Sequence, residues 1–325
     1  MSGPGQGLAP EWQGRVDAED GEAGRRWHQV VQPLAAGPPG VALLGFASDE
    51  GVRRNQGRTG AAEGPRALRR ALAPLAWHGT RGIPLYDAGD VACAGEDLEG
   101  AQRAFGARVE ALLAAGHFPL LGGGGHEIAW GSFQGIAAAL GRDGRLPGFG
   151  IVNIDAHFDL RGGPAATSGT PFRQIHDALA ARGLPFRYLC LGIARAANTP
   201  ALFRAAQDCG ARWLLDEELV WPRWEAVTRA IDGFVATIGA LQVTVCLDAF
   251  PAAAAPGVSA PAARGIAPDF ALAMLKYLLE RAGHGSPGSK VVLAEVAELC
   301  PRLDPDGRTA RLAARIVHDL AAPLL

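Results

Sequence analysis

The chain has few cysteines and no long apolar run, and these absences exclude several classes of protein. Its five cysteines are scattered along 325 residues and form no CxxC pair, so neither a disulfide framework nor a thiolate zinc site is predicted. No stretch reaches the roughly 18 consecutive apolar residues of a membrane span, and the N-terminal residues contain no apolar signal region. We therefore predict a soluble, cytoplasmic protein that does not enter membranes.

An excess of basic residues is missing too. The chain has 31 Lys and Arg against 33 Asp and Glu, a formal net charge of −2. Nucleic-acid and membrane-surface proteins normally carry a basic patch that appears in this balance. The expected partner is a small-molecule substrate and not a nucleic acid or a membrane, and the sequence leaves a homo-oligomer open.

Hydrophobic residues, 48% of the chain, follow a repeating pattern. After a Gly-, Pro- and charge-rich stretch, short apolar runs alternate with longer segments of helical period such as 97–115. This alternation predicts βαβ units, and hence an α/β fold with a mostly parallel sheet and helices on both faces. Residues 1–38 are interpreted as an irregular N-terminal arm packing on the domain, and 39–325 as a single domain. The eight expected strands are 41–46, 83–87, 118–121, 149–155, 188–192, 212–215, 243–248 and 291–296.

Three potential metal ligands follow the apolar run 149–154. In an extended chain Asp155, His157 and Asp159 would share one face, because side chains two positions apart point the same way. Buried carboxylates are normally paired or metal-bound, and carboxylate with imidazole suits Mn²⁺ or a similar ion. The alternative is a solvated strand end with a capping Asp.

Two further strand ends carry candidate ligands. The third predicted strand runs into four glycines and then His126, at the start of a helix. A phosphate-binding loop is the competing interpretation, but the Gly-Lys-Ser/Thr ending of such loops is missing. The seventh strand ends in Cys246 and Asp248, which share a face by the period of two; an isolated Asp here would more often be a turn residue.

The last predicted strand carries Glu295 within an apolar run. Burying that carboxylate costs several kcal/mol unless a partner compensates its charge. A cationic group of the substrate would do so, and the alternative is an internal salt bridge with an arginine.

At these motifs the chain resembles the arginase-type ureohydrolase superfamily. The resemblance rests on GGGHE at 123–127, DAHFD at 155–159, LDAF and APGVSAP within 247–261, and AEV at 294–296. Within the superfamily the chain is similar to the formimidoylglutamases. That narrower resemblance rests on WQGR at 12–15, RWHQ at 26–29, GVRRN at 51–55, GRTGAAEGP at 57–65, SGTPFRQ at 168–174, and GGGHE in place of the usual GGDHS.

The resemblance implies a three-layer α/β/α arginase-like metallohydrolase domain with an eight-stranded sheet and two Mn²⁺ per subunit. It places His126 and Asp159 on one metal and His157 and Asp248 on the other, with Asp155 bridging both. One position departs from the family, since Cys246 stands where the superfamily has a bridging aspartate. A thiolate there would favour Zn²⁺, Fe²⁺ or Co²⁺ over Mn²⁺, whereas a neutral thiol would be only a buried apolar side chain.

The activity implied is hydrolysis of N-formimidoyl-L-glutamate, a linear amidine, to L-glutamate and formamide in histidine degradation. A metal-bridging hydroxide would attack the amidine carbon, with Asp159 as general base and acid and Glu295 holding the amidinium. Two alternatives remain: a ureohydrolase of the agmatinase or guanidinobutyrase type, and a catalytically silent ligand-binding relative. The predicted substrate-binding residues are Asn55, Arg58, Ser168 and Arg173.

Overall fold

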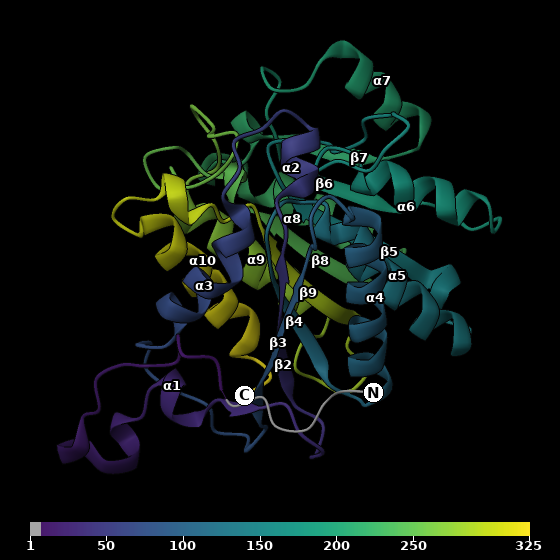
Figure 1. Ribbon diagram of the computed structural model, residues 1–325. Coiled ribbons are helices and arrows are strands. Elements are labelled where there is room, and N and C mark those ends of the chain that lie inside the picture. The colour runs from purple at the N-terminus through teal and green to yellow at the C-terminus, as the bar shows by residue number, and fades with distance from the viewer. Residues whose placement is uncertain (1–7) are drawn as a thin grey trace.

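A parallel β-sheet forms the middle layer of the molecule in the computed structural model, which describes residues 8–325 (Figure 1). In these residues the sheet has nine strands in the order β1-β3-β2-β4-β9-β8-β5-β6-β7, and all neighbouring strands are parallel. The strands are β1 (Gln32–Pro33), β2 (Val41–Ala47), β3 (Leu85–Ala92), β4 (Phe118–Gly123), β5 (Phe149–Ile154), β6 (Tyr188–Ile193), β7 (Arg212–Leu215), β8 (Ala240–Cys246) and β9 (Val291–Ala297).

All eight predicted strands are present, and the predicted parallel α/β class is confirmed. The additional strand, β1, has only two residues and pairs with Tyr86 and Asp87 at one edge of the sheet. It lies in the segment predicted to be an irregular arm, where Gln32 and Pro33 carry no apolar pattern. The first seven residues of that predicted arm lie outside the described residues.

Helices cover both faces of the sheet and complete the three layers (Figure 1). Buried side chains of α3, α8, α9 and α10 belong to the hydrophobic core on one face, and those of α4, α5, α6 and α7 to the core on the other. Within residues 8–325 no helix has both the length and the apolar character needed to cross a membrane. The α-helices are α1 (Trp27–Val30), α2 (Glu50–Arg54), α3 (Gly64–Leu72), α4 (Leu98–Ala114), α5 (Ile128–Arg142), α6 (Pro171–Ala180), α7 (Pro200–Asp208), α8 (Trp224–Val235), α9 (Pro268–Arg281) and α10 (Arg308–Ala321). Short 3-10 helices span Ala18–Gly24, Ala61–Glu63, Leu146–Gly148, Asp216–Glu218, Trp221–Arg223, Leu247–Ala249 and Pro301–Leu303.

The sequence periods explain how the two cores are filled. Along β5, Phe149 and Ile151 belong to one core and Val152 and Ile154 to the other, because successive side chains of a strand point to opposite faces. A strand buried on both faces is therefore mostly apolar, and the buried exception in β5 is Asn153. This packing fixes β5 tightly and determines where the polar residues that follow Ile154 emerge.

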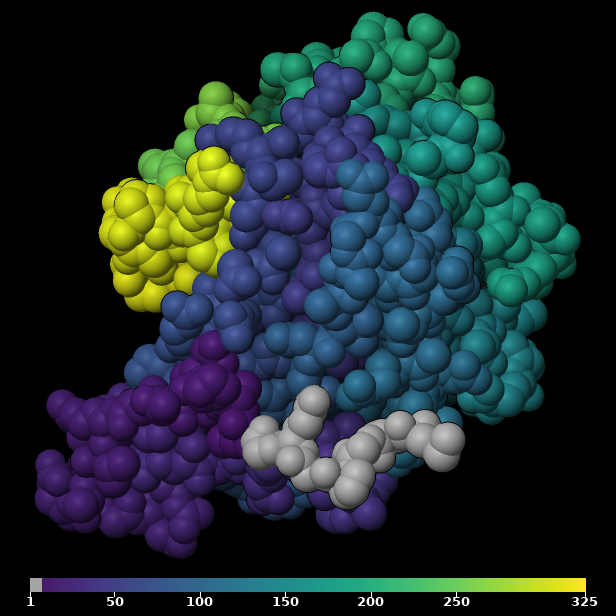
Figure 2. Space-filling view, in the orientation of Figure 1, coloured from purple at the N-terminus to yellow at the C-terminus, as the bar shows by residue number. Residues whose placement is uncertain are grey.

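The N-terminal segment is attached to the end of the sheet at which the strands begin. Residues 8–38 gather at one end of the molecule in the space-filling view, coloured purple (Figure 2). Trp27 is buried and stacks edge-on against Trp77. Trp12 is also buried, and its indole N–H donates to Asp87 Oδ2 over 2.7 Å. The same carboxylate accepts two hydrogen bonds from the buried guanidinium of Arg69, at 2.8 and 2.9 Å.

Replacing Trp12 with phenylalanine is expected to lower the free energy of unfolding by about 2 kcal/mol. The change keeps an aromatic ring but removes a buried hydrogen bond to a charged group. Urea unfolding at a fixed metal concentration measures the loss. Trp221→Phe is the matched control, because its indole also donates to a carboxylate, Asp269, but the side chain is 51% exposed. Its cost should be below about 0.5 kcal/mol, and equal losses in the two variants would contradict the prediction.

Candidate metal centre

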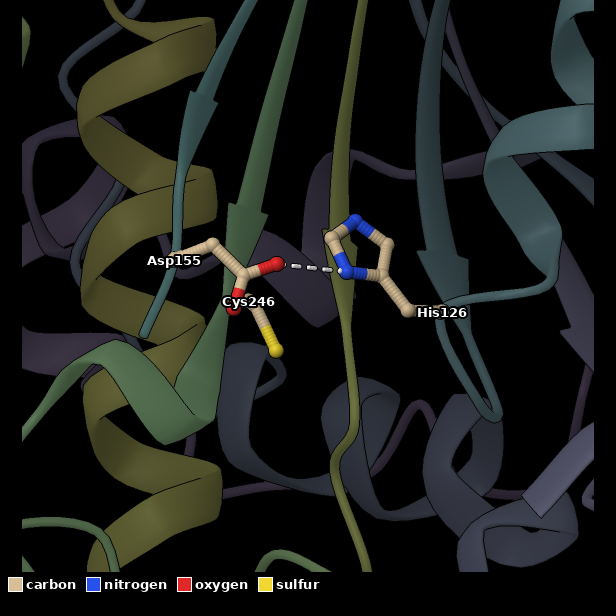
Figure 3. Close-up of side chains that lie close together, drawn as sticks. All are labelled: His126, Asp155 and Cys246. Atoms are coloured by element: carbon tan, nitrogen blue, oxygen red, sulfur yellow. Dashed lines mark ion pairs between the residues drawn. The ribbon is translucent and has the colours of Figure 1, made fainter. Parts of the chain in front are cut away.

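Polar side chains meet at the carboxyl ends of β4, β5 and β8. These strands lie close together in the sheet, with only β9 between β4 and β8. Ligand sites of open parallel sheets lie at this edge. Figure 3 shows His126 from the turn after β4 facing Asp155 after β5 and Cys246 at the end of β8.

Asp155 lies at the centre of the group. It is fully buried, and Oδ1 accepts a hydrogen bond from the backbone N–H of His157 while Oδ2 accepts one from the Asn153 amide. Oδ2 also lies 2.9 Å from His126 Nδ1, and Oδ1 lies 3.6 Å from His157 Nδ1. Each oxygen of one carboxylate thus faces a different imidazole.

The ring of His126 is oriented by a neighbouring strand. Its Nε2 lies 3.0 Å from Thr244 Oγ1 on β8, which leaves Nδ1 turned toward the carboxylates. Nδ1 lies 2.9 Å from Asp155 Oδ2 and 3.1 Å from Asp159 Oδ2, yet it is buried without hydrogen-bonding geometry to either. A nitrogen held between two carboxylate oxygens in this way is suited to a cation.

A second group of donors lies on the other side of Asp155. His157 Nδ1 lies 3.1 Å from Asp248 Oδ2, and the buried Asp248 Oδ1 has no hydrogen-bond partner. Ligand atoms of Asp155, His157 and Asp248 all lie within 4.8 Å of one another. The same separation holds for His126, Asp155 and Cys246, so two donor sets share Asp155.

The backbone that brings these residues together is not the extended strand assumed from the sequence. β5 ends at Ile154, and Asp159 has a φ of 48°, which is uncommon for a residue with a side chain. Asp248 likewise lies in a 3-10 turn after β8. The predicted ligands still converge, but they do so through turns and not by alternation along a strand.

The charges around the centre show that a cation would fit there. Within residues 8–325 no lysine or arginine forms an ion pair with Asp155, Asp159 or Asp248. Burial and the charge of Asp155 raise the pKa of Asp159 to about 6. Burial also raises the pKa of Asp248, whereas for Asp155 the two histidines outweigh burial and lower it. Buried carboxylates at this density require positive charge, and carboxylate with imidazole is a donor set that Mn²⁺ accepts.

The structure gives Glu295 a different environment from the one predicted. Its carboxylate accepts hydrogen bonds from Ser132 Oγ at 2.7 Å and Gln242 Nε2 at 2.9 Å, within the sheet and under α5. These contacts, and not the predicted arginine or substrate cation, compensate its burial. The expected role of holding an amidinium is therefore not supported for Glu295.

Glu298, which the sequence interpretation passed over, reaches the centre instead. It follows the end of β9, its Oε1 accepts the backbone N–H of His126 at 2.9 Å, and its Oε2 is buried without a partner. Burial and the charges of Asp248 and Glu127 raise its pKa to about 8. The sequence signal that could have identified Glu298 is its position just after a strand end, which is also where the candidate ligands lie.

The four predicted substrate-binding residues fall into different environments. Asn55 Nδ2 donates to Ser168 Oγ at 3.2 Å, so the structure brings these two together. Arg58 donates to the backbone oxygens of Val258 and Ser259. Arg173 is paired with Asp177 one helical turn away on α6.

A cavity of about 440 Å³ opens beside His157. Its walls come from the loops after β5, β6, β7 and β8, and they include two cationic side chains, Arg195 and Arg264. Among the described residues neither arginine takes part in a side-chain ion pair, while Arg195 lies over the ring of Phe203. The acidic residues Asp216 and Glu217 line the same cavity.

Comparison with known proteins places this centre in a family. Residues 39–322 match the model of the arginase family. The chain belongs to the arginase family. The resemblance inferred from the sequence motifs is thereby confirmed over nearly the whole chain.

The chain is highly similar to several formimidoylglutamases. The chain is 51% identical to the formimidoylglutamase of Aromatoleum aromaticum over 319 residues, which cover 95% of this chain and 91% of that protein. It is 50% identical to the formimidoylglutamase of Ralstonia nicotianae over 310 residues, covering 94% and 93%.

Solved structures of arginase-family relatives have the same fold. Trypanosoma cruzi formiminoglutamase with two Mn²⁺ matches with a TM-score of 0.73 and 26% identity, covering 87% of this chain and 93% of that one. Bacillus subtilis formimidoylglutamase matches with a TM-score of 0.79 over 93% of this chain and 92% of that one; at 22% identity it supports the fold alone.

Proposed function

We propose that the chain hydrolyses N-formimidoyl-L-glutamate to L-glutamate and formamide, a metal-dependent step of histidine degradation. The observation that carries the proposal is the similarity of about 50% identity over 95% of the chain to formimidoylglutamases, with the donor cluster of the centre inside the matching span. The substrate has a cationic amidine on its α-nitrogen and two carboxylates, one on the adjacent α-carbon and one at the end of the side chain, so the site needs groups of both signs.

We assign the metal positions from the two donor sets. His126 and Asp155, with Asp159 close to His126 Nδ1, would hold one divalent cation, and Asp155, His157 and Asp248 would hold a second. Two bound cations supply hydroxide at neutral pH by lowering the pKa of water.

Two carboxylates would handle the proton and the amidine. Asp159 lies beside His126 and would act as general base and then general acid. It would accept a proton from the attacking water and pass it to the leaving nitrogen. Glu298 Oε1 is fixed by the backbone of His126, so its free Oε2 is oriented to accept a hydrogen bond from the amidinium. Glu298 takes this role in place of Glu295.

The two carboxylates of the substrate require cationic partners. Arg195 and Arg264 line the cavity next to His157, whereas Arg58 donates to the Val258 and Ser259 carbonyls and Arg173 Nε pairs with Asp177. We therefore assign the carboxylates to the cavity arginines, with Asn55 and Ser168 as a polar pair on the loops beside the centre.

Arg195→Ala is expected to raise KM about tenfold and to leave kcat nearly unchanged. The guanidinium would bind a part of the substrate that does not react, and an exposed charge-assisted hydrogen bond is worth about 1.5 kcal/mol. Steady-state formamide release measures both constants. Arg173→Ala is the control, because Asp177 already pairs with that side chain. A larger rise in KM for the control would indicate that Arg173, and not Arg195, binds a substrate carboxylate.

The function itself is tested by metal analysis and a substrate panel. Protein purified without chelator is analysed for metals, supplied with Mn²⁺, and assayed on N-formimidoyl-L-glutamate, agmatine and guanidinobutyrate. Formamide release from the first substrate alone is the expected result. Urea release without formamide would indicate a guanidino-specific ureohydrolase. Tight substrate binding without turnover would indicate a silent relative.

A further inference from the structure

The two donor sets of the centre differ in one atom type. Asp155, His157 and Asp248 offer only oxygen and nitrogen, whereas the set around His126 includes the sulfur of Cys246 (Figure 3). Asp155 contributes one oxygen to each side, so both positions share it as a common ligand. One position of the pair is therefore chemically different from the other.

The surroundings of Cys246 leave its sulfur directed into the centre. The residue is the last of β8, is 1% exposed, and its Sγ lies within 4.8 Å of ligand atoms of both His126 and Asp155. Within residues 8–325 it forms no disulfide. A buried thiol next to two other donor atoms can become a thiolate ligand when a cation arrives, because metal binding displaces the proton.

Thiolate, imidazole and carboxylate ligands select different ions. Thiolates favour the softer first-row cations, and carboxylate with imidazole accepts Mn²⁺. We propose that the centre is a mixed-metal pair, in which His126, Cys246 and Asp155 hold Zn²⁺, Co²⁺ or Fe²⁺ in preference to Mn²⁺, and Asp155, His157 and Asp248 hold Mn²⁺. The proposal rests on the proposed function only in placing cations at this centre.

Cobalt is the probe for the sulfur-containing position. Metal-free protein is given one equivalent of Co²⁺ and one equivalent of Mn²⁺ per chain, because excess Co²⁺ would also displace Mn²⁺ from a site of oxygen and nitrogen ligands. The protein is then dialysed and analysed for both elements. The expected result is one Co²⁺ and one Mn²⁺ per chain, with the near-ultraviolet absorption of a thiolate-to-cobalt charge transfer. Bound Co²⁺ without that absorption would overturn the assignment of Cys246 as a ligand.

Two variants and a control complete the test. Cys246→Asp is expected to lose the charge-transfer absorption, to bind two Mn²⁺ per chain, and to lower the preference for Co²⁺ over Mn²⁺ at this position at least about tenfold. Cys246→Ser, which retains the size of the side chain, should lose the absorption as well. Cys209→Ser, in a half-buried cysteine at the end of α7, should change neither quantity.

The outcomes separate this inference from the proposed function. Two Mn²⁺ in the unmodified protein, with the same affinity as in Cys246→Asp, would overturn the mixed-metal pair even if formamide is released. A charge-transfer absorption in a protein that releases no formamide would support the metal assignment and contradict the function. The metal analysis and the absorption spectrum are both recorded without substrate and so do not depend on turnover.

Discussion

Replacing Asp155 with asparagine is expected to empty both metal positions and to lower formamide release about a thousandfold or more. Each oxygen of Asp155 faces one of the two histidines, so loss of its charge weakens both positions at once. Activation of water by the metal pair contributes several kcal/mol to the barrier, and each 1.36 kcal/mol is a factor of ten in rate. Elemental analysis and initial rates measure the two effects.

Asp232→Asn provides the comparison for that variant. Asp232 is a partly exposed carboxylate bound to Tyr277 and Arg281, away from the strand ends. The control should keep its full metal content and rate. Two metals per chain in Asp155→Asn would contradict the role of Asp155 as the shared ligand, whatever the activity.

Glu298→Gln is expected to lower kcat/KM about a hundredfold while the metal content stays constant. Glutamine keeps an oxygen for the His126 N–H but cannot ionise, so it lacks the carboxylate charge that would form against a bound amidinium. Truncating one partner of a buried charge pair costs about 2–5 kcal/mol, and a hundredfold loss lies within that range. Formamide assays over a range of substrate concentrations give the value.

Glu295→Gln separates the two glutamates of the β9 segment. Glu295 is bonded to Ser132 and Gln242, so its replacement should reduce the free energy of unfolding by about 1–3 kcal/mol and leave kcat/KM nearly unchanged. A loss of kcat/KM in Glu295→Gln as large as that in Glu298→Gln would indicate that Glu295 binds the amidinium.

The contrast between these glutamates marks the limit of prediction from sequence. Glu295 is conspicuous because it interrupts an apolar run, but its partners come from α5 and β8, which are distant in the chain. Glu298 lies after the strand with a φ of 70°, an irregular conformation that no periodic pattern encodes. Periodicity locates strands well because burial on both faces requires it, and it carries no information on loop geometry.

The proposed metal ligands were more predictable for a physical reason. His126, Asp155 and Cys246 each stand at the end of a buried strand or within three residues after it, and parallel strands present those ends at one edge of the sheet. The arginines of the cavity had no such signal. Arg195 and Arg264 lie in loops, and the sequence alone does not distinguish them from solvated surface charges.

The strand order has a consequence for the biosynthesis of the enzyme. β4 and β5 follow one another in the chain, but β9 and β8 lie between them in the sheet. On the ribosome, a nascent chain that has emerged only through β7 therefore has a gap where two strands must still insert. His126 and Asp155 lie on opposite sides of that gap. Metal acquisition is thus expected only after synthesis has passed β9, because both sides of the centre exist only from then on.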